Sequence, residues 1–117
     1  MVYNYLYNGR DSNNRSDGFL MDSKILYLND LYDYYGQLLT EKQQQYFEDY
    51  YFNNLTLSEI AENNNISRNA IHKQIKEAEN KLIIFEEKLG LLNKKKAILK
   101  LIKNLENEIK EKIEELI

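Results

Sequence analysis

The chain of 117 residues contains no cysteine and no proline, and it has only one histidine, His72, and four glycines. Without cysteine there is no disulfide, thiolate metal site or cysteine nucleophile. A single histidine argues against a histidine-based zinc site and against a Ser-His-Asp triad. The glycines form neither a GxGxxG nor a GxxxxGK[ST] loop for binding phosphate. We therefore expect a protein that is not an enzyme and that has no metal or cofactor.

Long hydrophobic runs are also missing. No segment approaches the roughly 20 apolar residues that a membrane-spanning helix needs. The N-terminus lacks the apolar core of a secretion signal. The sequence therefore predicts a cytoplasmic protein without a membrane span.

Positive charge is scarcer than in most nucleic-acid-binding domains, because the formal net charge is −3. Residues 1–54 contain four basic and eight acidic residues, a net charge of −4. Residues 55–85 contain four of each, and residues 86–117 contain eight lysines and seven glutamates, a net charge of +1. The negative excess therefore does not forbid DNA contact beyond residue 54. The neutral segment 55–85 nevertheless favours weak DNA affinity unless a dimer presents two such segments.

Composition divides the chain into three parts. Residues 1–20 include the polar stretch GRDSNNRSDG, which has no periodicity, and we expect a disordered or non-native leader. The alternative is a short docking strand with Tyr3, Tyr5 and Tyr7. Residues 21–89 should form a helix-turn-helix domain, and residues 90–117 a C-terminal helix that mediates dimerisation.

The helical spacing of apolar residues predicts an all-α fold with five helices. The first helix should run from an N-cap at Ser23 to Leu39. The capping boxes Thr40–Gln43 and Thr56–Glu59 should open the second and third helices. Ser67 should cap the fourth helix.

The apolar pattern in the C-terminal half changes phase near Gly90. One stripe ends at Leu89 and a new one starts at Ile98. We expect two helices, about 67–89 and 94–116, with a turn near Gly90, and a single bent helix is the alternative. The apolar stripes of these helices can pack on each other as a hairpin, on the three-helix unit or on a second copy. Because the last helix extends beyond what a small helix-turn-helix unit can cover, we favour a homodimer.

A helix-turn-helix motif is indicated by five residues around the asparagine turn of residues 63–65. Ala61 provides the small residue where the two helices touch. Asn65 tolerates the left-handed backbone of the turn. Ile66 should plug the elbow, Ser67 should cap the second helix, and Ile71 should pack inward.

The outward face of this second helix is the candidate DNA-binding site. It comprises Ser67, Arg68, Asn69, His72, Lys73 and Lys76. Arginine and asparagine can read guanine and adenine edges, lysines suit phosphates, and a capped helix N-terminus can hold a phosphate. The competing interpretation is a solvated face on a motif that does not bind DNA. Asn64 and Gln74 stand where such motifs usually have apolar residues, and Glu77 and Glu79 shorten the basic patch.

Residues 38–82, LLTEKQQQYFEDYYFNNLTLSEIAENNNISRNAIHKQIKEAENKL, resemble region four of bacterial sigma factors. A longer stretch from about Leu26 to Leu92, including LYDYYGQLLTEKQQQYFEDYY and the trailing FEEKLGL, is similar to the YlxM-like helix-turn-helix family. This resemblance implies a non-enzymatic regulator of the signal recognition particle pathway of protein targeting. The alternative is an interaction module that binds the targeting GTPase or its RNA and no DNA.

Two further groups of residues could contact a partner. Lys94, Lys95 and Lys96 would crowd the N-terminus of the last helix, which the helix dipole disfavours. Either that helix starts earlier or an anion such as RNA phosphate lies nearby, unless these are solvated lysines on a turn. The second group consists of tyrosines, which could stack on bases but more simply form the core: Tyr32, Tyr34, Tyr35, Tyr46, Tyr50 and Tyr51.

Overall fold

The structure is a computed structural model that describes the backbone from residue 17 and the side chains from residue 23. Its elements are α2 (Asp17–Tyr35), the 3-10 turn η1 (Gly36–Leu38), α3 (Glu41–Tyr51), α4 (Leu57–Asn64), α5 (Arg68–Leu89), α6 (Leu91–Ile102) and α7 (Asn107–Leu116). Residues 17–117 contain no strand, so the predicted all-α fold is confirmed. Most of the expected leader, with Tyr3, Tyr5 and Tyr7, lies outside the described residues.

Three helices begin at the caps that the sequence predicts. The Thr40 and Thr56 hydroxyls each accept a hydrogen bond from the backbone amide three residues on, and the side chains of Gln43 and Glu59 accept one from the amide of the cap residue. The Ser67 hydroxyl accepts from the Ala70 amide over 3.0 Å at the start of α5. Each such cap stabilises a helix by about 1 kcal/mol, so these starts are encoded locally.

The first helix differs from the prediction at both ends. Ser23 lies inside α2, which begins at Asp17, so Ser23 is not its N-cap. The α-helix also stops at Tyr35 and tightens into η1 instead of continuing to Leu39. Gly36 is buried there, and a Cβ on it would lie 2.8 Å from Cε1 of Tyr32. A glycine therefore allows the backbone to approach this ring closely.

The expected last helix, 94–116, is two helices. The first, α6, starts earlier, at Leu91, and ends at Ile102, and the Leu105 amide donates to the Ile102 carbonyl in the turn that leads to α7. The alternative of one bent helix is therefore also wrong. Gly90, with φ of 65°, forms the break after α5 where the sequence predicts it.

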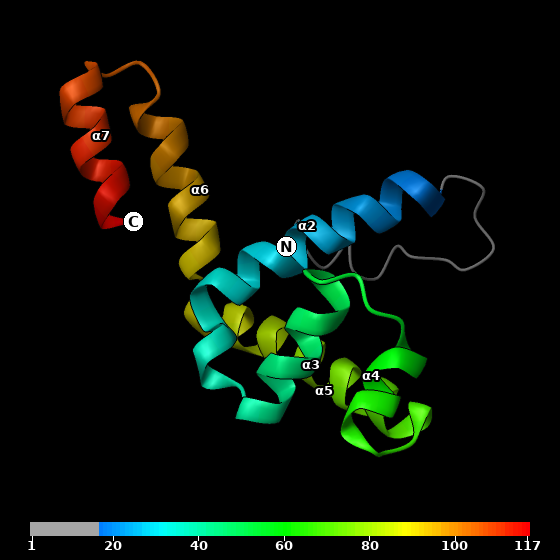
Figure 1. Cartoon of the computed structure of the whole chain (residues 1–117). Coiled ribbons are helices and arrows are strands. Elements are labelled where there is room, and N and C mark those ends of the chain that lie inside the picture. The colour runs from blue at the N-terminus through cyan, green and yellow to red at the C-terminus, as the bar shows by residue number, and fades with distance from the viewer. Residues whose placement is uncertain (1–16) are drawn as a thin grey trace.

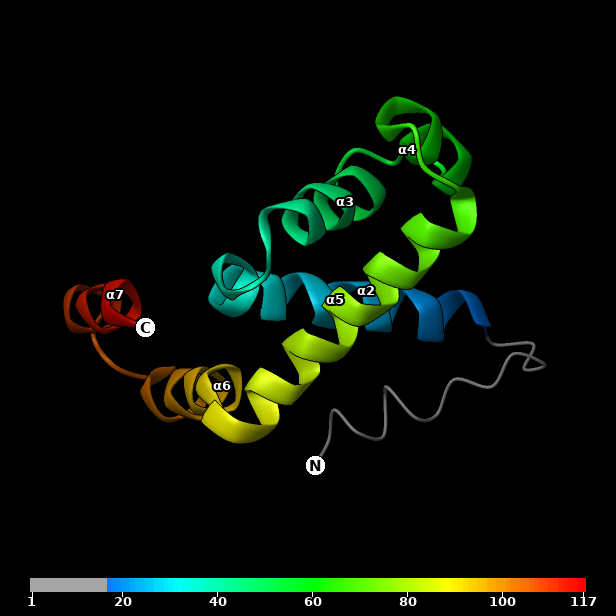
Figure 2. The ribbon, with the colours of Figure 1, turned by 90° about the horizontal axis from the view of Figure 1, so that it is seen from below.

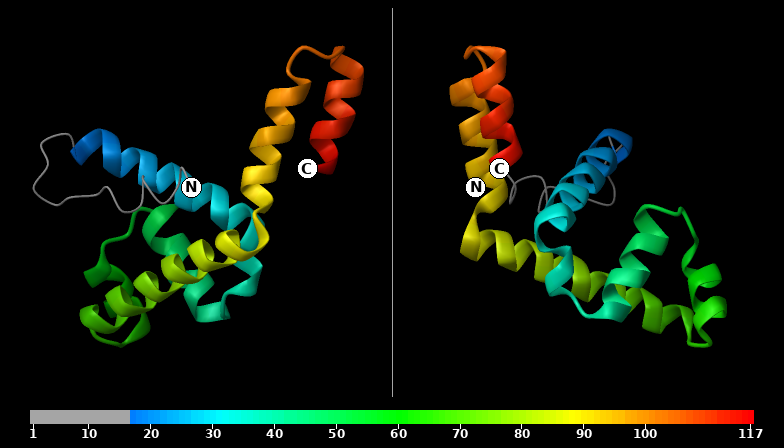
Figure 3. Two further views of the ribbon diagram at one scale, coloured as in Figure 1. Left: turned by 180° about the vertical axis from the view of Figure 1, so that it is seen from behind. Right: turned by 60° about the vertical axis from the view of Figure 1, so that its left-hand side comes forward.

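The elements form a compact body and a projecting hairpin. Figure 2 shows α5 as a long diagonal helix, with α4 packed near its start and α6 leaving its end. Helices α2 and α3 pack along α5 between these two ends. The α6–α7 hairpin, residues 91–116, stands away from α3 and α4 in both views of Figure 3 and in Figure 1.

The core has two clusters. The larger joins α2 and α3 to α5 and α6 through Leu28, Leu31, Phe47, Leu82 and Leu92 and other buried residues. The smaller joins α3 to the helix-turn-helix and consists of Tyr46, Ile60, Ala61, Ile71 and Ile75. It packs α4 and the start of α5 against each other and against α3, which fixes the relative position of these helices.

Candidate nucleic-acid interface

The elbow between α4 and α5 is a left-handed asparagine turn, as predicted. Asn65 has φ of 57° and ψ of 39°, and its amide and that of Ile66 donate to carbonyls at the end of α4. Ala61 is buried at the contact between the helices, and Ile71 is fully buried.

Ile66 departs from this prediction, because it does not plug the elbow. Its side chain is 40% exposed. The fully buried pair Ile60 and Ile71 fills the elbow instead, one from α4 and one from α5. These two positions lie on the inward faces of regular helices, whereas Ile66 lies in the irregular turn.

Asn64 and Gln74, the two polar residues at positions that are usually apolar in such motifs, each form a side-chain hydrogen bond. The Asn64 side-chain amide donates to the Ile60 carbonyl over 2.7 Å, at the end of its own helix. Gln74 accepts from the side chain of Gln43 on α3 over 3.3 Å, and Ile75 takes the buried position beside it. Both polar residues therefore support the helix-turn-helix rather than weaken it.

All six residues of the candidate DNA-binding face are exposed: Ser67, Arg68, Asn69, His72, Lys73 and Lys76. Asn69, His72, Lys73 and Lys76 share one side of the first turns of α5, and Arg68 lies beside them at the first position of the helix. The first turn of α5 has no acidic residue to offset the positive end of the helix dipole. The structure therefore brings the predicted residues together on one open face.

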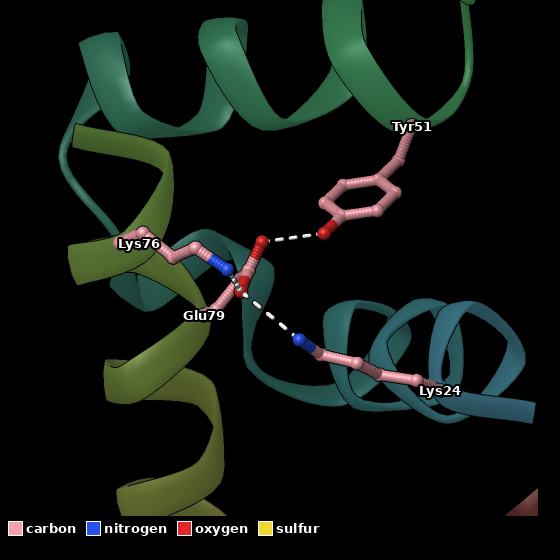
Figure 4. A network of polar contacts seen from close by, with 4 residues as sticks. All are labelled: Lys24, Tyr51, Lys76 and Glu79. Atoms are coloured by element: carbon pink, nitrogen blue, oxygen red, sulfur yellow. Dashed lines mark hydrogen bonds and ion pairs between the residues drawn. The ribbon is translucent and has the colours of Figure 1, made fainter. Parts of the chain in front are cut away.

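Lys76 differs from the other residues of this face because it also has a partner inside the protein. Its Nζ lies 3.5 Å from Oε1 of Glu79, which is 1% exposed. Lys24 of α2 approaches the same oxygen to 4.0 Å, and the Tyr51 hydroxyl donates to the other oxygen (Figure 4). Glu79 therefore points into the protein and does not shorten the basic patch on the surface. The sequence does give a signal for this, since Glu79 lies four residues after the buried Ile75.

The N-terminus of α6 has its anion within the chain. Glu86, which is 2% exposed, accepts from the Leu92 amide over 3.1 Å and from the Asn93 amide over 3.0 Å. A buried carboxylate thus caps the N-terminus of α6, which also starts before the lysines. The sequence alone does not indicate this role of Glu86, because the capping depends on how the chain turns at Gly90.

The side chains of the three lysines, Lys94, Lys95 and Lys96, have different surroundings. Lys95 is half-buried, and its Nζ lies 5.8 Å from the centre of the Tyr34 ring. Lys94 and Lys96 are exposed on the surface of α6. An external anion could therefore approach Lys94 without breaking a contact with an aromatic ring.

The tyrosines are mainly core residues, as the simpler interpretation predicts. Tyr35 and Tyr46 are buried, and Tyr32 stacks on Phe47 with 4.6 Å between ring centres. Burial, and then the hydrogen bond to Glu48, raises the pKa of Tyr32. Tyr50 is partly exposed and, with His72, lines a small surface pocket beside the Glu79 contacts.

Within residues 17–117, no helix is both long and apolar enough to cross a membrane. Residues 23–117, whose side chains the structure describes, contain no group of three or more histidine, aspartate or glutamate side chains placed to hold a metal ion.

The helices α4 and α5, joined by the turn at Asn65 and packed together through Ile60 and Ile71, define a helix-turn-helix protein. The chain belongs to the UPF0122 family, described as "Putative helix-turn-helix protein, YlxM / p13 like", whose profile matches residues 22–117. This confirms the resemblance to the YlxM-like family. The resemblance to sigma region four and the association with the signal recognition particle stay predictions.

Several bacterial members of the family are closely similar. The UPF0122 protein of Malacoplasma penetrans is 56% identical over 77 residues, which are 63% of this chain and 72% of the relative. That of Thermoanaerobacter sp. is 47% identical over 79 residues, 68% of each chain. That of Listeria monocytogenes is 42% identical over 92 residues, 79% of this chain and 84% of the relative.

Proposed function

We propose that this protein binds duplex DNA through the start of α5 and acts as a regulator. One observation carries this proposal. Arg68, Asn69, His72 and Lys73 are exposed and make no side-chain hydrogen bond or ion pair with another described residue. They project from a helix that the buried Ile71 and Ile75 fix against α3 and α4, so little ordering of the backbone is needed on binding.

Each residue of this face has a distinct role in the proposal. Arg68 and Asn69 lie at the tip of α5, the part of a recognition helix that reaches base edges in the major groove. Lys73 and Lys76 lie one and two turns further on and would contact phosphates. Ser67 and the free amides of the first turn would hold one more phosphate.

The test is a salt titration of binding to genomic DNA fragments, with wild type compared with Arg68→Ala and Lys73→Ala. Arg68→Ala should cost about 1–3 kcal/mol on preferred fragments and reduce sequence preference. Lys73→Ala should weaken binding to all fragments and lower the salt slope by about one. Lys88→Ala, which removes an exposed lysine from the far end of the same helix, is the matched control. Equal and weak binding by wild type and Arg68→Ala at low salt would overturn the proposal.

A second candidate function is an interaction module of protein targeting, which binds the signal recognition particle GTPase or its RNA. The exposed Lys94 on α6 favours it, because its side chain is open to an anionic partner. Binding of the particle's RNA should then weaken in Lys94→Ala and be unchanged in Arg68→Ala. A pull-down that recovers neither the GTPase nor the RNA would exclude this candidate. The cytoplasmic location expected from the sequence stays a prediction under either function.

A further inference from the structure

The α6–α7 hairpin leaves apolar side chains uncovered. Helix α7, which is described in full, contains no buried residue although Ile109, Ile113 and Leu116 share one face. Leu116 is 85% exposed and Ile109 49%. In the preceding helix and turn, Leu101 is 82% exposed and Leu105 43%. Apolar surface of this kind, gathered on one projecting element, marks an interaction site.

The charges of the two helices are of opposite sign. Residues 91–105 contain five lysines and no acidic residue, whereas residues 106–117 contain five glutamates and two lysines. The two helices run side by side in opposite directions (Figures 1 and 3). The hairpin therefore presents a cationic half and an anionic half beside its exposed apolar side chains.

We propose that the hairpin pairs with the same hairpin of a second copy, so that α6 of each copy lies beside α7 of the other. A two-fold axis brings one surface patch against itself, which suits apolar side chains on both copies. The same axis, with the hairpins antiparallel, sets each cationic helix against an anionic one. A partner of a single charge sign would match only half of the hairpin, which is why a second copy fits best.

This arrangement would leave both candidate DNA-binding faces free. Arg68 and the hairpin lie at opposite ends of α5 (Figure 2), a helix of 22 residues that is about 33 Å long. The pairing does not depend on DNA binding, so it can be tested with the protein alone.

The first experiment measures the mass of the full chain by sedimentation equilibrium over a range of concentrations. Wild type should approach twice the chain mass of 14.0 kDa. The double variant Leu101→Lys/Leu116→Lys should sediment as a monomer with unchanged helix content, because both side chains are almost fully exposed within one chain. Leu26→Lys is the matched control, since Leu26 is 65% exposed on α2, and this variant should stay dimeric. A monomeric wild type, or a double variant that remains dimeric, would overturn the proposal.

The second experiment exchanges charges and remains decisive if the leucine variant fails to fold. One variant combines Lys94→Glu, Lys100→Glu and Lys103→Glu. The other combines Glu111→Lys, Glu114→Lys and Glu115→Lys. Each alone should associate more weakly than wild type by roughly tenfold or more, because both of its helices then have the same charge sign. An equimolar mixture should restore the dimer, since each α6 again meets an α7 of opposite charge. A mixture that stays monomeric would contradict the proposed pairing of α6 with α7.

Discussion

The Tyr35 hydroxyl donates a hydrogen bond to Oε1 of Glu86 over 2.6 Å, and both side chains are almost completely buried. The same hydroxyl accepts from the Leu91 amide over 3.0 Å, and Glu86 also accepts from the amides of Leu92 and Asn93. Two side chains, from α2 and α5, thus satisfy three consecutive free amides at the start of α6. This joint fixes the direction in which the hairpin leaves the body.

Replacement of Glu86 should therefore destabilise the whole fold. In Glu86→Gln, a neutral side chain keeps the shape but replaces one acceptor with a donor that faces backbone amides. We expect a loss of about 1–3 kcal/mol in the free energy of unfolding, measured by urea denaturation. Glu87→Gln, at the exposed neighbouring position, should leave the free energy of unfolding within about 0.5 kcal/mol of wild type. Equal stability of the two variants would show that the joint does not stabilise the fold.

The same joint predicts a loss of stability at alkaline pH. Burial, and then the hydrogen bond to Glu86, raises the pKa of Tyr35 from 10.0 to about 12. Because this pKa is higher in the folded protein than in the unfolded chain, the contribution to stability is complete below about pH 10. It is lost as the pH rises through about 12. Urea denaturation at a series of alkaline pH values should show a smaller loss in Tyr35→Phe than in wild type. A pH dependence that is the same in both proteins would count against this role for Tyr35.

Parts of the fold that depend on neighbouring residues could be predicted from the sequence. The caps at Thr40, Thr56 and Ser67 and the turn at Asn65 each follow from a few adjacent side chains. The break between α6 and α7 could not be predicted, because the apolar stripe from Ile98 continues across it without a change of phase.

The roles of Glu79 and Glu86 depend on contacts between helices. Their partners include Tyr51, 28 residues away from Glu79, and Tyr35, 51 residues away from Glu86. From the sequence alone, a glutamate is expected on the surface, because burial of an isolated carboxylate is costly. Only the tertiary structure shows that each of these two carboxylates has hydrogen-bond donors in the core. The exposed candidate face on α5, by contrast, was predictable, because its residues are neighbours on one helix.

Loss of the Glu79 carboxylate should weaken the attachment of α5 to α2 and α3. Glu79→Leu would remove the carboxylate that accepts from the Tyr51 hydroxyl and that lies near Lys24 and Lys76. We expect a loss of about 1–3 kcal/mol in a urea titration, since two of the donors are partly exposed and can reach water. Glu77→Leu, two residues earlier on the same helix, is the control and should cost less. If both variants unfold at the same urea concentration as wild type, the buried carboxylate is not needed for stability.

Two glycines should respond to an added methyl group for different reasons. At Gly36 the Cβ would lie 2.8 Å from the Tyr32 ring, which stacks on Phe47 and cannot easily move. Gly36→Ala should therefore cost about 1–3 kcal/mol through overpacking. At Gly90 nothing lies within 4 Å, but φ is 65°, so Gly90→Ala should cost about 1 kcal/mol through backbone strain alone. Asparagine tolerates this backbone, so Gly90→Asn should recover part of the loss at Gly90, whereas Gly36→Asn should be worse than Gly36→Ala. Thermal denaturation of the four variants separates the two causes, and a reversed order at either glycine would refute the cause assigned to it.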